Sequence, residues 1–190
     1  MKKLIVASNN KGKLKEIKEI LSGIYEVVPM GEAGFNEEIA EDGNTFYENA
    51  LIKAKTVSEA LGADALADDS GLCVEALSGE PGIYSARYSG HHGYDAANRA
   101  KLLRELEGKK NRNAKFVSAV VLYKTNGEIV KGVGETYGKI AFKEEGTNGF
   151  GYDSLFISDD LHKSFGVASS EEKNSISHRK RALIDLLGHL

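Results

Sequence analysis

A hairpin signal at Asn126-Gly127 limits the folds open to this chain more than any other feature. The dipeptide separates two runs with strand character, 115–123 and 129–137, and Asn-Gly favours the tight turns that join antiparallel strands. Upstream of this hairpin, segments with strand patterns alternate with segments of helical periodicity. A hairpin added to alternating strands and helices favours an α/β fold with a mixed sheet over a purely parallel one.

The expected elements follow from hydrophobic periodicity and from capping signals. Thr45 and Glu48 have the spacing of a capping box, so they mark the start of one helix. The 190 residues fit a single domain, 1–190, which can have two lobes but has no separable linker. We expect helices at 13–21, 45–61, 96–106 and 177–187, strands at 3–7, 25–29, 65–68, 72–76, 115–123, 129–137 and 155–157, and loops at 31–43 and 79–93.

Composition argues against several classes of protein. Lys and Arg number 25 against 28 Asp and Glu, and the net charge of -3 disfavours binding along duplex nucleic acid. The single cysteine, Cys73, allows no intrachain disulfide, so we expect a small core residue in a reducing cytoplasm. No apolar run is long enough for a signal peptide or a membrane span. His91 and His92 lack further ligands nearby, so we interpret them as surface residues.

Two adjacent carboxylates, Asp68 and Asp69, stand between the apolar runs 65–67 and 72–74. Asp-Asp-Ser-Gly is good turn chemistry, so a polar turn is one interpretation. If a strand ends here, the two side chains point to opposite faces. One carboxylate could then hold a hard cation while the other polarises a water molecule. Gly71 would allow a tight turn or a close approach to a ligand.

The segment 8–13, Ser-Asn-Asn-Lys-Gly-Lys, leads from a strand into a helix. Free backbone N–H groups and the helix dipole attract anions at such a position, and two lysines add positive charge. The P-loop pattern is absent, and a simple helix-capping turn is the alternative. Further along, Glu41 could reach a metal and Lys53 could reach phosphate, although a solvated helix position is the commoner fate of a lysine. Glu48 could be only a capping carboxylate.

Two late segments offer aromatic and basic groups. In 147–153, Phe150 and Tyr152 flank a glycine and could stack on a base, or they could be two core aromatics. In 173–179, Ser177 can cap the last helix, which places His178 and Arg179 in its first turn. Positive charge there opposes the helix dipole, so donation to a ligand carbonyl or phosphate would explain it. A surface arginine is the alternative.

Taken in this order, the segments resemble the Ham1-like inosine triphosphate pyrophosphatases, also called dITP/XTP diphosphatases. The strongest pieces are ADDSGL at 67–72, PGIYSARYSG at 81–90, GFGYD at 149–153 and EKNSISHR at 172–179. The resemblance implies an elongated, two-lobed α/β fold around a central mixed sheet with flanking helices and an active-site cleft between the lobes. It also implies a homodimer that uses Mg²⁺ to hydrolyse ITP, dITP and XTP to the monophosphate and pyrophosphate.

The resemblance also implies roles for individual residues. Asp69 would be the general base, and Glu41 and Asp69 would contact the metal with Asp68 close by. The chain departs from the family's motifs at Ser154, where many relatives have proline, and at 166–168, Gly-Val-Ala. The implied substrate-binding residues are Ser8, Asn9, Asn10, Lys11, Gly12, Lys13, Lys53 and Ser70 for the triphosphate, Phe150, Gly151 and Tyr152 for the base, and Asp153, Lys173, His178 and Arg179 for sugar, phosphate or base edge.

Base selection would follow from the direction of hydrogen bonds. A keto oxygen at the purine six-position accepts, whereas the adenine amino group would leave buried donors of Arg179, His178 or the backbone unpaired. Two other functions stay open. One is a Maf-type pyrophosphatase that acts on dTTP or UTP. The other is a nucleotide-sensing module without turnover, which the intact Asp68-Asp69 pair disfavours.

Overall fold

The computed structural model describes all 190 residues, Met1–Leu190, as two compact units. Unit 1 consists of Met1–Asp69, Ser118–Gly134 and Arg179–Leu190, and unit 2 of Ser70–Val117 and Glu135–His178. The strands are β1 (Lys2–Val6), β2 (Tyr25–Pro29), β3 (Ala65–Val74), β4 (Asn113–Tyr123), β5 (Ile129–Ile140) and β6 (Phe156–Ser158). The helices are α1 (Lys11–Ile20), α2 (Phe46–Leu61), α3 (Asp95–Glu105), α4 (Ser170–Ile176) and α5 (His178–Leu187), with 3₁₀ turns η1 (Glu75–Leu77), η2 (Gly82–Arg87) and η3 (Asp153–Leu155).

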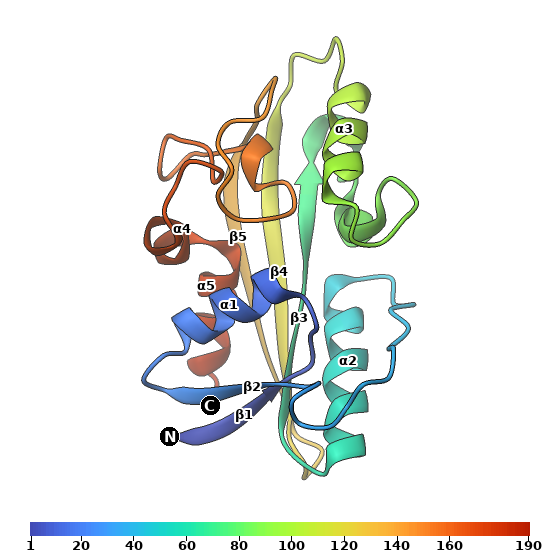
Figure 1. The fold of residues 1–190 in the computed structure, drawn as a ribbon, viewed down its shortest axis with the longest axis vertical. Helices are drawn as coiled ribbons and strands as arrows, with labels where there is room; N and C mark the ends of the chain where they lie inside the picture. Colours follow the sequence, from blue (N-terminus) through green and yellow to red (C-terminus); the bar gives the residue numbers. More distant parts are fainter. The chain divides into compact units, whose positions relative to one another are not determined.

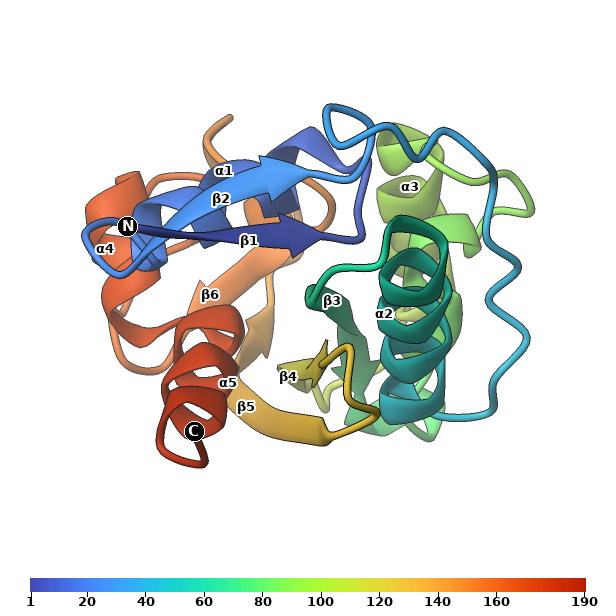
Figure 2. The same cartoon turned by 90° about the horizontal axis from the view of Figure 1, so that it is seen from below.

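The strands form one six-stranded sheet in the order β2-β1-β3-β4-β5-β6. β1 pairs in parallel with β2 and with β3, as Figure 2 shows for β1 and β2, whereas β5 and β6 pair antiparallel. β4 and β5 are joined at the predicted hairpin turn, where Gly127 has a φ of 85°. The predicted α/β class with a mixed sheet and flanking helices is therefore confirmed.

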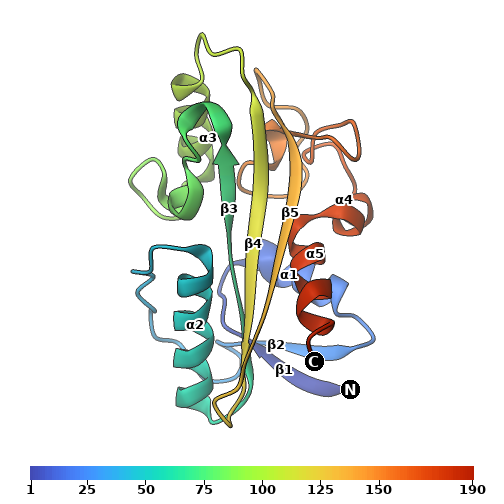
Figure 3. The same ribbon diagram turned by 180° about the vertical axis from the view of Figure 1, so that it is seen from behind.

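Helices cover both faces of the sheet in unit 1. α1 and α5 pack on one face through Ile17 and Leu183, against Leu66 of β3 and Val120 of β4. α2 packs on the other face, where Ala54, Val57 and their neighbours contact Ala65, Ala67 and Val121. Figures 1 and 3 show α2 on one side of these strands and α1 and α5 on the other. The alternation of side chains along each strand assigns successive residues to the two cores.

Unit 2 has its own core of aromatic and leucine side chains. Leu72 of β3, Phe116 of β4 and Leu102 of α3 belong to this cluster. The rings of Phe116 and Phe156 lie 4.6 Å apart between centroids, and those of Phe156 and Phe165 lie 5.0 Å apart. Both arrangements are tilted, the geometry that aromatic pairs prefer. Unit 1 thus buries two apolar clusters, one on each face of the sheet, and unit 2 buries a third.

Several expected elements differ from the structure. The strands predicted at 65–68 and 72–76 are one continuous strand, β3, and the turn between them is wrong, because residues 65–69 are all buried and the ladder continues past Gly71. The loop expected at 79–93 contains η2. Helix α4 was not predicted.

Cys73 is only half-buried rather than a core residue. His91 and His92 are exposed, as expected. No helix here combines the length and the apolar character needed to span a bilayer.

Candidate active site

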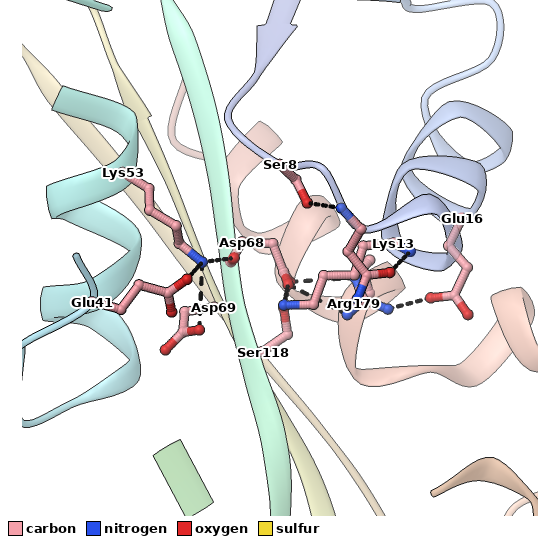
Figure 4. Close-up of polar contacts among 10 residues, drawn as sticks. Ser8, Lys13, Glu16, Glu41, Lys53, Asp68, Asp69, Ser118 and Arg179 are labelled. Carbon is pink, nitrogen blue, oxygen red and sulfur yellow. Dashed lines mark hydrogen bonds and ion pairs between the residues drawn. The ribbon is translucent and has the colours of Figure 1, made fainter. Parts of the chain in front are cut away.

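Strand β3 separates its two adjacent aspartates onto opposite faces of unit 1. Asp68 shares the face of Leu66, which α1 and α5 cover, and Asp69 shares the face of Ala67, which α2 covers. Figure 4 shows the two carboxylates on either side of the β3 ribbon. The predicted divergence of the two side chains is confirmed, although it occurs within a strand and not at the end of one. Each carboxylate therefore has its own electrostatic surroundings.

Asp68 is the centre of a buried ion-pair network. Its carboxylate lies 2.9 Å from Lys13 Nζ and accepts from Arg179 Nε and Nη2 at 3.3 Å, and it also accepts from the Ser118 hydroxyl. Arg179 donates further to Glu16 of α1. Burial alone would raise the pKa of Asp68, but the charges of Arg179 and Lys13 outweigh burial and hold it well below its usual range. Asp68 is thus ionised at neutral pH.

Asp69 lies in a different environment on the α2 face. Lys53 Nζ is 3.5 Å from Asp69 Oδ1 and 3.5 Å from Glu41 Oε1 (Figure 4). The second oxygen, Asp69 Oδ2, is buried and has no hydrogen-bond partner. Burial raises the pKa of Asp69 to about 6, with Glu41 and Asp68 adding to the rise and Lys53 and Lys13 opposing it. A carboxyl with a pKa near neutrality and an open oxygen is suited to accept a proton.

Lys53 is buried, with 8 % of its surface exposed, so the interpretation as a solvated helix position is wrong. Its ammonium donates to the Asp68 backbone carbonyl at 2.8 Å as well as pairing with the two carboxylates. α2 projects this lysine inward from its third buried position, on the same face as Ala50 and Ala54. The ammonium of Lys53 therefore bridges the carboxylates of Glu41 and Asp69 on the α2 face.

The structure does not gather Glu41, Asp68 and Asp69 into one metal-binding group. Asp68 lies on the other face and its carboxylate is held by Lys13, Arg179 and Ser118, so no three acidic, histidine or cysteine side chains converge as metal ligands. Glu41 and Asp69 are the pair that fits a hard cation. The open Oδ2 of Asp69 and the partly exposed carboxylate of Glu41 are oxygen donors of the kind that Mg²⁺ prefers.

The segment before α1 adopts a capping structure. Asn10 is the N-cap, and its side chain accepts from the Lys13 N–H at 3.0 Å, while the Asn10 N–H donates to Ser8 Oγ at 3.1 Å. The capping interpretation is confirmed for these residues. Asn9, Asn10 and Lys11 are exposed, so their backbone and side chains are accessible, and phosphate binding by this segment stays a prediction. Ser70 is half-buried within β3.

In unit 2, Asp153 and Lys173 form a buried ion pair with 2.7 Å between Oδ2 and Nζ. The same Asp153 oxygen accepts from the Phe150 N–H at 3.0 Å, and Lys173 Nζ lies 4.9 Å from the centroid of the half-buried Phe150 ring. This arrangement combines an aromatic face with a fixed ammonium. Such a pair can stack on a planar base and donate to it or to a phosphate.

Two of the residues expected to touch a ligand belong to the interior. Tyr152 is a core aromatic with 5 % exposure, and its hydroxyl donates to the Ser85 carbonyl at 2.6 Å, so it does not form a sandwich with Phe150. The guanidinium of Arg179 is completely buried against Asp68 and Glu16, so it is neither a surface arginine nor a donor facing a ligand. His178 stacks on Phe116 at 4.8 Å between ring centroids.

A sequence profile of the Ham1 family matches residues 4–189. The chain belongs to the Ham1 family. This Ham1 chain is 48 % identical over 186 residues to the dITP/XTP pyrophosphatase of Haemophilus influenzae, with 95 % of each chain covered. It is also 48 % identical over 187 residues to the enzyme of the same name from Bacillus subtilis, covering 96 % of this chain and 94 % of that one.

Solved Ham1 structures have the same fold as this chain. The Ham1 protein of Staphylococcus aureus superposes with a TM-score of 0.88 at 41 % identity, covering 99 % of this chain and 97 % of that one. The HAM1 protein of Coxiella burnetii gives a TM-score of 0.88 at 37 % identity over 100 % of both chains. The resemblance drawn from the short motifs is confirmed over the whole length.

The two departures of this Ham1 chain from the family's motifs meet in unit 2. A Cβ on Gly166 would stand 2.8 Å from the Cα of Ser154, which leaves no room for a side chain there. Ser154 in turn donates from its hydroxyl to Glu144 Oε1 at 2.8 Å. The Gly166 N–H donates to the Asp153 carbonyl at 3.0 Å. Ser154 and Gly166 therefore both make hydrogen bonds that hold the loop after Tyr152 in place.

Sequence reasoning missed three buried polar residues of this Ham1 site: Glu16, Ser118 and Asn49. Glu16 and Ser118 complete the Asp68 network, and Asn49 lies one helical turn before Lys53. Only Asn49 had a detectable signal, since it is four residues from a lysine already singled out and so shares its helical face. Glu16 looked like any acidic helix residue, and Ser118 was hidden in an apolar strand.

Proposed function

We propose that this chain hydrolyses dITP, XTP and ITP to the nucleoside monophosphate and pyrophosphate, and thereby cleanses the nucleotide pool. Two full-length relatives at 48 % identity that are named dITP/XTP pyrophosphatase support this reaction. The observation that carries the proposal is the Asp69 carboxyl, which is buried, has one open oxygen and has a pKa of about 6. Asp69 accepts the proton of the attacking water.

The charge of the triphosphate must be offset before a water can attack. We propose that Glu41 and Asp69 hold Mg²⁺, which when bound supplies Lewis-acid stabilisation of the phosphate oxygens. Lys53, placed 3.5 Å from both carboxylates, keeps these two acidic groups together. The N-terminus of α1 and its exposed first residue, Lys11, contribute positive potential for phosphate.

We propose that Phe150 and Lys173 recognise the base. The Phe150 ring offers a stacking surface, and Asp153 fixes both the loop and the Lys173 ammonium. Selection of keto purines then falls to backbone donors, Lys173 and His178, because Lys173 pairs with one carboxylate whereas Arg179 pairs with two. A keto oxygen would accept from such donors, whereas an amino group would leave them unpaired, at a cost of about 1–3 kcal/mol each.

The test is pyrophosphate release from a panel of dITP, XTP, ITP, GTP, ATP, dTTP and UTP, with Mg²⁺ and with a chelator. We expect Mg²⁺-dependent release from the first three substrates and little from GTP or ATP. A preference for dTTP or UTP would identify a Maf-type activity instead. Nucleotide binding without release from any substrate would identify a sensing module.

We further propose that the chain works as a homodimer in the cytoplasm. The support for the dimer is the resemblance to the Ham1 family, which extends over residues 4–189. Analytical ultracentrifugation of the full chain checks the dimer, and a single species of one-chain mass at micromolar concentration would contradict it.

A further inference from the structure

The loop that carries Glu41 has no secondary structure and is attached to the start of α2 by side-chain acceptors. The Gly43 N–H donates to Asn49 Oδ1 at 2.8 Å, and the Asn44 N–H donates to Glu48 Oε2 at 2.6 Å. The Glu48 N–H donates to the Thr45 hydroxyl at 3.1 Å. The Glu48 side chain thus bonds one residue upstream of the N–H used in the usual capping box, and no further backbone hydrogen bond fixes residues 41 and 42.

Gly43 fits against α2 so closely that only glycine can occupy the position. A Cβ there would lie 2.7 Å from Glu48 Cβ and 2.8 Å from Asn49 Oδ1. Two residues upstream, the Glu41 carboxylate is 29 % exposed and makes a 3.5 Å contact with Lys53 Nζ. A separation of 3.5 Å is long for an ion pair, so Lys53 alone holds Glu41 loosely. The hydrogen bond of the Gly43 amide to Asn49 also positions Glu41.

Asn49 is buried, with 1 % exposure, although its residue type is usually found at the surface. Its Nδ2 has no hydrogen-bond partner, which costs stability for a buried donor. Asn49 also lies four residues before Lys53, so both side chains project from the same face of α2.

We propose that Asn49 is a positioning residue for Glu41: its Oδ1 anchors the Gly43 amide and thereby holds the Glu41 carboxylate on the α2 face beside Lys53 and Asp69. This inference rests on the proposed function, in which Glu41 and Asp69 hold Mg²⁺. Groups that orient a metal-binding carboxylate without touching the metal commonly change metal affinity by about 10- to 100-fold when they are removed.

The test compares Asn49→Ala with Asn44→Ala in the full chain. Asn44 is an exposed residue of the same type five positions earlier, and its side chain makes no described bond, so it is a matched control. In metal-free protein, Asn49→Ala is expected to speed hydrogen exchange of the Gly43 amide at least about tenfold. Mg²⁺ binding, measured by calorimetry with the metal alone, is expected to weaken about tenfold. The control should change neither.

Two further variants keep the inference falsifiable if Asn49→Ala folds poorly. Asn49→Asp retains an acceptor oxygen but removes the open Nδ2 donor, so the Gly43 amide should stay protected. Gly43→Ala pushes the loop off the helix while Asn49 stays intact, so Mg²⁺ binding should weaken as in Asn49→Ala. Unchanged Gly43 exchange in Asn49→Ala, or unchanged Mg²⁺ affinity in both alanine variants, would overturn the inference. Neither readout depends on nucleotide hydrolysis, so failure of the proposed function would be seen separately in the wild-type substrate panel.

Discussion

Ionised Asp69 lowers the free energy of unfolding of the chain at neutral pH, because its carboxylate is buried. The folded pKa, about 6, lies above the ordinary 3.8, so the folded state binds more protons than the unfolded state between these values. Stability contributed by protonated Asp69 is therefore present at low pH and is lost as the pH rises through about 6. Ionised Asp69 costs up to about 3 kcal/mol above that pH, by the usual conversion of a pKa difference into free energy.

Under the proposed function, Asp69→Asn is expected to lose hydrolysis by about 10²- to 10⁴-fold, because the proposed general base is removed. The same variant should gain stability relative to wild type as the pH is raised from 4 to 7. Steady-state assays and urea denaturation across this range check the two effects. Asp159→Asn, at an exposed position, serves as the control. A stability difference that is constant with pH would contradict the assigned titration.

Arg179→Ala is expected to unfold the chain more easily rather than to change its substrate choice. Removal of the guanidinium leaves Asp68 and Glu16 buried without their shared partner, which costs about 3–5 kcal/mol. Arg179→Lys should recover little, since an ammonium cannot reproduce the planar fork of donors. Urea denaturation measures the loss, with exposed Arg104→Ala as a control. Unchanged stability together with faster ATP hydrolysis would contradict this role.

At single residues, the sequence predicted that Asp68 and Asp69 point to opposite faces, but it did not predict that Arg179 is buried in an ion-pair network. A motif indicates which residue types occur together, but not which of them face a ligand and which satisfy one another. The role of Arg179 depends on its buried hydrogen bond to Glu16, a residue 163 positions away in the chain. No local pattern contains such a pairing.

Among the elements, α5 packs against β5 at Gly132. A Cβ at this position would meet the backbone carbonyl of Ala182 and would lie 2.8 Å from Leu186 Cβ. Gly132→Ala is therefore expected to destabilise unit 1 by about 1–3 kcal/mol, because a helix backbone must shift. Val133→Ala, at a position that is 50 % exposed, should have little effect. Equal denaturation midpoints for the two variants would contradict this packing.

Helix α3 anchors the loop of Phe150 within unit 2. Asp95 Oδ2 accepts from the Gly151 N–H at 3.1 Å, and Arg99 Nη1 donates to the Gly151 carbonyl at 2.8 Å, while Arg99 Nε pairs with Glu144 at 2.6 Å. Under the proposed function, Arg99→Ala should raise the KM for XTP about tenfold, since a charged hydrogen bond is worth about 1.5–3 kcal/mol.

The change in kcat of Arg99→Ala should be smaller than the change in KM, because the variant leaves Asp69 and Lys53 intact. Steady-state kinetics with XTP separate the two constants, and Arg104→Ala on the same helix is the matched control. A fall in kcat with KM unchanged would show that α3 does not act through the base-binding loop.

Most elements were predictable because their periodicity or caps are local. The errors arose where tertiary packing overrides local chemistry. Asp-Asp-Ser-Gly favours a turn by propensity, yet it lies within β3 because both faces of the strand are covered. The short helix α4 had a readable signal in the capping box of Ser169 and Glu172, but its seven residues carry too little periodicity to be found by pattern.

At the scale of the molecule, three strands contribute to both cores. Leu66 and Leu72 of β3 belong to different clusters, as do Phe116 and Val120 of β4. Neither unit is a continuous stretch of chain, and β3, β4 and β5 each run from one unit into the other. No sequence boundary signals this division, because the boundaries fall inside strands.

We therefore expect one cooperative unfolding transition. Leu102→Ala, in the core of unit 2, should cost about 2–5 kcal/mol, and it should lower the exchange protection of the most protected amides in α2 of unit 1 by the same free energy. Native-state hydrogen exchange measures both. Protection in α2 that is unaffected by the substitution would show that the units unfold independently.

The divergence of two identical neighbours along β3 has a consequence for how this protein can vary. Asp68 and Asp69 share a peptide bond, yet one is ionised at neutral pH and the other titrates near neutrality. We therefore expect selection to act on them for unrelated reasons: changes at 68 would remove protein by misfolding, whereas changes at 69 would, under the proposed function, leave abundant but inert protein. An insertion or deletion of one residue within the strand would exchange their surroundings, which no side-chain substitution could then repair.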